Sequence, residues 1–79
     1  TLKLNELIGG FLKENYPYSS FHDLRIVKGP SFTNVIFDLV LPFDKADKQE
    51  EIKQKIVEIL NAEDGKYYAV IEFENSFED

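Results

Sequence analysis

The segment 33–41 constrains the fold more than any other part of the sequence. From residue 35 onward its odd-numbered positions are all apolar, and they are Val35, Phe37, Leu39 and Leu41. Polar Asn34 and Asp38 share the even positions with Ile36 and Val40. Because successive side chains of a strand point to opposite faces, this alternation predicts a strand with one buried face and one mixed face.

Two helices are predicted, one before and one after the segment 33–41 in the sequence. Apolar residues recur at helical spacing over residues 2–15, and Gly9 and Gly10 within this helix indicate close packing against another surface. A second apolar stripe predicts a helix over about 45–61, with Asp44 as its N-cap.

Two more strands complete the pattern. Residues 21–28 alternate as a strand, and the turn signal Gly29-Pro30-Ser31 predicts an antiparallel hairpin with segment 33–41. A last strand is predicted over 67–74. The order α-β-β-α-β therefore predicts an α+β domain in which both helices cover one face of a three-stranded sheet.

The other face of this sheet is expected to be free of helices. Its predicted occupants are Asp23, Arg25, Asn34, Ile36, Asp38, Val40, Tyr68, Val70, Glu72 and Glu74. This mixture is too apolar for a fully solvated surface and too acidic for a core, so it indicates a self-association face or a lined cleft. Arg25, Ile36 and Val40 are the predicted interface residues.

Composition narrows the function. Residues 1–79 are long enough for one domain with one core, and they contain no cysteine for a disulfide or a thiolate metal site. The formal charge of −6 argues against nucleic acid as a partner. The sequence has no apolar run long enough to span a bilayer, and because it starts at Thr1 rather than Met we expect a fragment of a longer protein.

Catalytic motifs are absent from the sequence, and it is predicted not to be an enzyme. No nucleophile elbow, cysteine nucleophile or phosphate loop occurs, and His22 is the single histidine. His22, Asp38, Glu72 and Glu74 come from strands expected to be neighbours and could bind a divalent ion, although spacing alone favours carboxylates that keep the sheet soluble. Strict alternation along the strand places His22 on the core side, so one site that uses all four residues requires a β-bulge or an early twist of the strand near Phe21.

One stretch resembles a known family. His22-Asp23-Leu24-Arg25, followed by Gly29-Pro30, resembles the hairpin that opens the cytoplasmic C-terminal domain of cation diffusion facilitator transporters. Segment 33–42 resembles the second strand of bacterial members, and the resemblance covers residues 21–74. The first helix matches more loosely, without the acidic turn entry of many members.

The resemblance implies a metallochaperone-like, ferredoxin-type domain on the cytoplasmic side of a divalent cation/proton antiporter. In that family the domain dimerises and binds regulatory metal near the dimer interface. His22 matches a histidine ligand of the first strand, whereas Asp38, Glu72, Glu74 and, less closely, Glu50 stand at the other ligand positions. Carboxylates in place of histidines weaken the preference for zinc and favour manganese or iron.

Two alternatives remain open at this point. The carboxylates are equally compatible with a domain that has lost metal regulation and kept only dimerisation. A free-standing ferredoxin-like module that binds a protein or small ligand on its open sheet face would show the same pattern. The leading prediction is a homodimeric regulatory domain that hangs from its own transmembrane domain at the cytoplasmic face of the cell membrane.

Overall fold

The described part of the chain forms two α-helices, one short 3₁₀ helix and three strands in a computed structural model. It covers residues 2–63 and 65–76. The elements are α1 (Leu2–Asn15), β1 (Ser20–Lys28), β2 (Thr33–Pro42), η1 (Phe43–Lys48), α2 (Gln49–Asn61) and β3 (Tyr67–Ser76). The predicted order α-β-β-α-β is confirmed, and no helix within these residues is long and apolar enough to cross a membrane.

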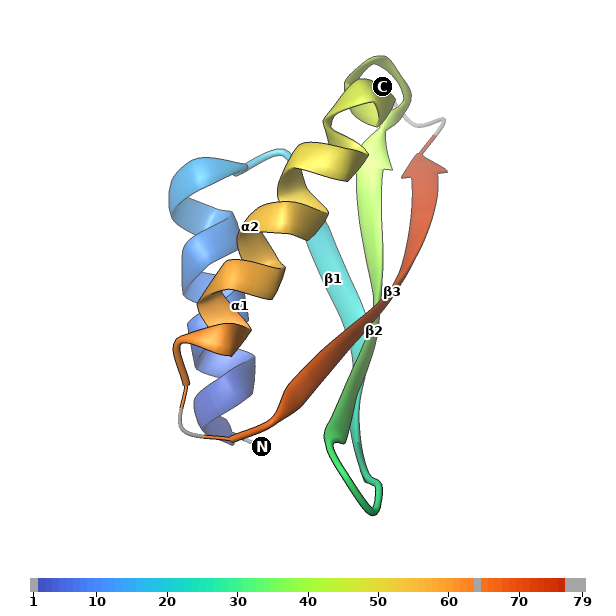
Figure 1. The fold of residues 1–79 in the computed structure, drawn as a ribbon. Coiled ribbons are helices and arrows are strands. Elements are labelled where there is room, and N and C mark those ends of the chain that lie inside the picture. Colours follow the sequence, from blue (N-terminus) through green and yellow to red (C-terminus); the bar gives the residue numbers. More distant parts are fainter. Residues whose placement is uncertain (1, 64, 77–79) are drawn as a thin grey trace.

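The sheet has β2 in its middle. Its order is β1-β2-β3, with β1 antiparallel to β2 and β3 parallel to β2. The parallel pairing follows from the crossover through η1 and α2, which returns the chain to the start of β2. Both helices lie on one side of the sheet, as predicted, and the other side carries no helix among the described elements (Figure 1).

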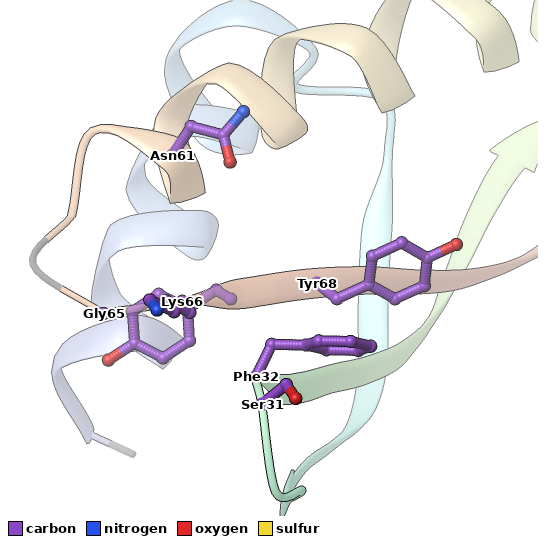
Figure 2. A pocket seen from close by; sticks show the side chains of 7 residues that line it. Ser31, Phe32, Asn61, Gly65, Lys66 and Tyr68 are labelled. Atoms are coloured by element: carbon purple, nitrogen blue, oxygen red, sulfur yellow. The ribbon is translucent and has the colours of Figure 1, made fainter.

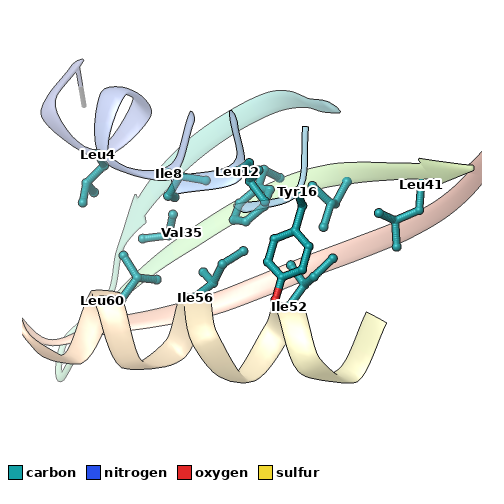
Figure 3. Packing of buried hydrophobic residues seen from close by; sticks show 11 residues of the cluster. Leu4, Ile8, Leu12, Tyr16, Val35, Leu41, Ile52, Ile56 and Leu60 are labelled. Carbon is teal, nitrogen blue, oxygen red and sulfur yellow. The ribbon is translucent and has the colours of Figure 1, made fainter. Parts of the chain in front are cut away.

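The core lies between the two helices and the inward face of β2. The odd positions of β2 that alternate in the sequence are all fully buried. Their partners come from one apolar stripe on each helix and from Tyr16, the residue directly after α1 (Figure 3). The cluster consists of Leu4, Ile8, Leu12, Tyr16, Val35, Phe37, Leu39, Leu41, Ile52, Ile56 and Leu60.

A polar contact joins the end of α1 to α2. The hydroxyl of Tyr16 donates a hydrogen bond to the carboxylate of Glu51. Burial of Tyr16, together with this bond to a charged acceptor, raises the pKa of Tyr16 to about 12. The same hydrogen bond lowers the pKa of Glu51. The hydrogen bond thus links the residue after α1 to the first turn of α2 at the edge of the core.

The start of the second helix differs from the prediction. After Pro42 the chain winds first as η1, and α2 begins at Gln49 with Lys48 as its N-cap. Asp44 lies in the first turn of η1, and neither helix start has a capping hydrogen bond from its N-cap side chain. The predicted N-cap at Asp44 is therefore wrong, because the tighter 3₁₀ turn shifts the α-helix four residues along the chain.

The two adjacent glycines of α1 have different surroundings. A Cβ atom at Gly9 would lie 3.2 Å from the ring of Phe21, so this glycine permits the close packing that the sequence predicts. A Cβ atom at Gly10 would meet nothing within 4 Å. The packing interpretation is confirmed for Gly9 and wrong for Gly10.

This difference gives a matched pair of variants. Gly10→Ala is expected to raise the free energy of unfolding by about 1 kcal/mol, because alanine favours the helix and its methyl group points into open space. Gly9→Ala gains the same propensity but must displace the Phe21 ring, so its gain should be smaller or negative. Urea denaturation followed by circular dichroism measures both, and equal gains would contradict the assigned packing.

Candidate metal centre on the open sheet face

A β-bulge in β1 determines which residues reach the open face. His22 pairs with Asp38, but Arg25 pairs with Ile36, so β1 holds one residue more than β2 across this interval. Asp23 is the extra residue and has a φ of 59°, in the left-handed region that aspartate tolerates better than most residues. The Nε–H of Arg25 donates to the carbonyl oxygen of Asp23 at 3.3 Å.

The bulge corrects the predicted position of His22. Phe21 and Leu24 are half-buried on the core side, whereas His22 between them is exposed on the open face. The parity argument that placed His22 on the core side is therefore wrong, because it assumed an unbroken strand. The bulge that a shared site required is present.

One row across the sheet brings together residues from all three strands. His22 on β1 pairs with Asp38 on β2, and Asp38 pairs with Glu72 on β3. Glu74 lies two residues further along β3, on the same face as Glu72. The row therefore places the histidine and three carboxylates on adjacent positions of the open face.

The three carboxylates form a compact cluster. One ligand oxygen from each of Asp38, Glu72 and Glu74 can be chosen so that all three atoms lie within 4.8 Å of one another. Asp38 is half-buried and the two glutamates are exposed. Three like charges at this separation repel one another, so the cluster has an electrostatic cost that a cation would offset.

The cluster fits a divalent cation that prefers oxygen ligands. Two oxygens bound to one ion with metal–oxygen bonds of about 2.1 Å are at most about 4.2 Å apart. The three carboxylate oxygens lie within 4.8 Å of one another, so a small side-chain rotation brings them close enough to bind one ion. A set of oxygen donors favours manganese-like ions over zinc, which prefers nitrogen and sulfur.

The other two predicted ligands lie outside this cluster. The Nε2 atom of His22 is 3.5 Å from the hydroxyl oxygen of Ser20, and His22 is not among the grouped residues although it is next to them in the row. Glu50 is exposed in the first turn of α2 and is not grouped with them either. The structure thus brings together three of the five predicted ligands.

The rest of the open face is apolar toward the start of β2. Arg25 pairs with Ile36, which pairs with Val70, and Val27 pairs with Asn34, which pairs with Tyr68. Val27, Tyr68 and Val70 are exposed large side chains. The face thus divides into an apolar half toward the start of β2 and an acidic half around the carboxylates. The predicted interface residues Arg25, Ile36 and Val40 all lie on this face, and Val40, which pairs with Glu74, lies in the acidic half.

Two solved structures resemble this domain closely. The MamB C-terminal domain, a magnetosome protein of Desulfamplus magnetovallimortis BW-1, matches with a TM-score of 0.77 at 21% identity, over 98% of each chain. The metal-bound C-terminal domain of the CzcD transporter from Thermotoga maritima matches with a TM-score of 0.67 at 20% identity, over 98% of this chain and 94% of that one. The chain shares the fold of these two domains.

The MamB and CzcD structures belong to the class of domain that the sequence resembles. Both are C-terminal domains of cation diffusion facilitator proteins, so the predicted fold is confirmed. No family model and no curated protein sequence matches the chain. At this level of identity the MamB and CzcD comparisons establish the fold, and the residues of the open face must carry the argument on function.

Proposed function

We propose that this chain is the cytoplasmic C-terminal domain of a cation diffusion facilitator transporter, and that it regulates the transporter by dimerising when a divalent cation binds. The observation that carries the proposal is the carboxylate cluster of Asp38, Glu72 and Glu74, formed at the positions where the family resemblance implies ligands. The shared fold with MamB and with the metal-bound CzcD domain supports it.

The chain's own residues would hold the cation on the open face. Asp38, Glu72 and Glu74 supply the oxygen ligands, and His22 lies beside Asp38 in the same row. A bound divalent cation supplies the positive charge that offsets the repulsion among these carboxylates. Manganese or iron suits this set better than zinc because most of its donors are oxygens.

Dimerisation would use the same face of the sheet. Ile36 and Val40 are half-buried on it, and Arg25 lies exposed beside Ile36. Two chains of charge −6 repel one another when their acidic faces approach, so partial neutralisation lowers the cost of pairing. A cation that binds the pair more tightly than the single chain stabilises the pair through linkage.

The test is a melting experiment on the metal-free chain. Addition of MnCl₂ or ZnCl₂ should raise the Tm, with manganese effective despite its weaker general affinity for ligands. At a hundredfold excess over Kd the expected stabilisation is about 2.7 kcal/mol, or about 10–20 °C for a domain of this size. Sedimentation equilibrium on the same samples should show the mass of a dimer.

A matched double variant provides the control. Asp38→Asn with Glu72→Gln should abolish the metal-induced shift and raise the metal-free Tm, because two repelling charges are removed. Glu14→Gln with Glu58→Gln removes the same charge from exposed helix positions and should leave the shift intact. An unchanged Tm in millimolar Mn²⁺ and Zn²⁺ would refute metal binding, and a monomer in every sample would refute dimerisation.

A further inference from the structure

A surface pocket lies at the opposite end of the sheet from the acidic half of the open face. It is a pocket of about 630 Å³ between the hairpin, the end of α2 and the start of β3. Its volume falls in the range of small-molecule sites. Neither the family resemblance nor the metal argument uses the residues that line it.

The backbone fixes the walls of this pocket. The N–H of Thr33 donates to the carbonyl oxygen of Lys66 at 2.7 Å, and Thr33 pairs in register with Tyr67. This places Phe32, just before β2, beside Tyr68 on β3, where their ring centroids are 5.5 Å apart. The site therefore exists before any ligand binds, which lowers the entropic cost of binding.

The two rings provide an exposed apolar surface. Phe32 is 47% exposed and Tyr68 is 58% exposed, although both are large aromatic residues. The ring planes are inclined by 52°, and Figure 2 shows the two rings next to each other. A flat aromatic ring can cover this surface by offset stacking or by an edge-to-face contact.

The charge in the pocket is opposite to that of the whole chain. Lys66 is the one charged residue of the lining, and it forms no ion pair within residues 2–63 and 65–76. The amide of Asn61 and the hydroxyl of Ser31 add hydrogen-bonding groups to the lining, from the end of α2 and from the hairpin (Figure 2). An anionic group on the ligand would be the complement of this lysine.

We propose that this pocket binds a small planar aromatic carboxylate, with its ring on Phe32 and Tyr68 and its carboxylate at Lys66. The inference stands apart from the proposed metal site, because it uses none of the cluster residues. A two-ring ligand of this class should bind with a Kd on the order of 1 mM, given the affinity per atom that an open site provides.

Titration of the ¹⁵N-labelled chain with 2-naphthoate tests the proposal. We expect saturable shifts of amide resonances confined to residues 31–33, 61 and 65–68, with a Kd near the value above. The uncharged 2-naphthamide should bind several-fold more weakly, because it offers no negative charge to Lys66. The absence of saturation up to about 20 mM, a scale set by the expected Kd, would overturn the proposal.

Two pairs of variants separate the parts of the site. Lys66→Gln should remove the preference for naphthoate over naphthamide. Lys28 lies near the same end of the hairpin but outside the pocket lining, so Lys28→Gln should keep this preference. Phe32→Ser should weaken both ligands at least threefold, whereas Phe43→Ser, which alters a 66% exposed ring beyond the other end of β2, should not. If the two variants of either pair lost the same amount of preference or affinity, the binding would be nonspecific and the proposed site would be refuted.

Discussion

Phe37→Ala is expected to leave a large fraction of the protein, on the order of half, unfolded at room temperature. Phe37 is fully buried in the middle strand, and its ring meets that of Phe21 edge-on with centroids 5.8 Å apart. Removal of a buried phenylalanine ring costs about 3–5 kcal/mol. A core of this size rarely supplies more than about 3–5 kcal/mol in total, so the loss equals the whole stability.

Urea denaturation monitored by far-ultraviolet circular dichroism measures this effect. Val27→Ala is the matched control, because Val27 lies in the same sheet with 49% of its surface exposed and should change stability by less than about 0.5 kcal/mol. A Phe37→Ala protein with a normal cooperative transition near the wild-type midpoint would show that the core does not depend on this ring.

Asp23→Val is expected to cost about 1–2 kcal/mol relative to Asp23→Asn. The φ of 59° at Asp23 suits aspartate and asparagine, whereas a β-branched residue is strained in this region. Both variants lose the same charge, so the comparison isolates the backbone term. Thermal and urea unfolding of the two proteins measure the difference, and Asp23→Gly should be at least as stable as the asparagine variant.

Deletion of Asp23 gives a further check on the bulge. Without this residue β1 becomes a regular strand, in which Phe21 and Leu24 still face the core and His22 still faces outward. The shortened chain should therefore fold with His22 on the open face. Equal stability of the valine and asparagine variants would contradict a strict requirement for the left-handed conformation.

Most of the fold was predictable because its periodicities are unambiguous. The apolar odd positions of β2 and the stripes of α1 and α2 identify the three parts of the core. The starts of elements were harder to predict, since the 3₁₀ turn of η1 has no hydrophobic repeat of its own. The tendency of aspartate to occupy turns could not by itself distinguish an N-cap from a position inside that turn.

The candidate metal centre was predicted in part. Asp38, Glu72 and Glu74 belong to strands whose pairing follows from the fold, so their proximity could be expected. The side of the sheet that His22 reaches could not be predicted, because one extra residue in a strand reverses the alternation of its side chains. An Asp at a strand position is a weak sign of such a bulge.

The aromatic pocket was not found from the sequence. Phe32 follows the hairpin turn and belongs to no periodic pattern, and Lys66 comes from a short connection before β3. Their proximity depends on the parallel register of β2 with β3, which joins segments far apart in the chain. Only an aromatic residue directly after a turn, where solvent exposure is expected, offered a sign of a surface role.

The parallel pairing of β2 with β3 also sets the order in which this domain can be completed during synthesis. The hairpin of β1 and β2 joins neighbouring segments and can form early, whereas Thr33 must wait for Tyr67 and Pro42 for Ser76. Until β3 has left the ribosome, the middle strand has one unpaired edge lined with backbone donors and acceptors. Such an edge readily pairs with another chain, so a nascent or truncated copy that lacks β3 is the form most exposed to aggregation.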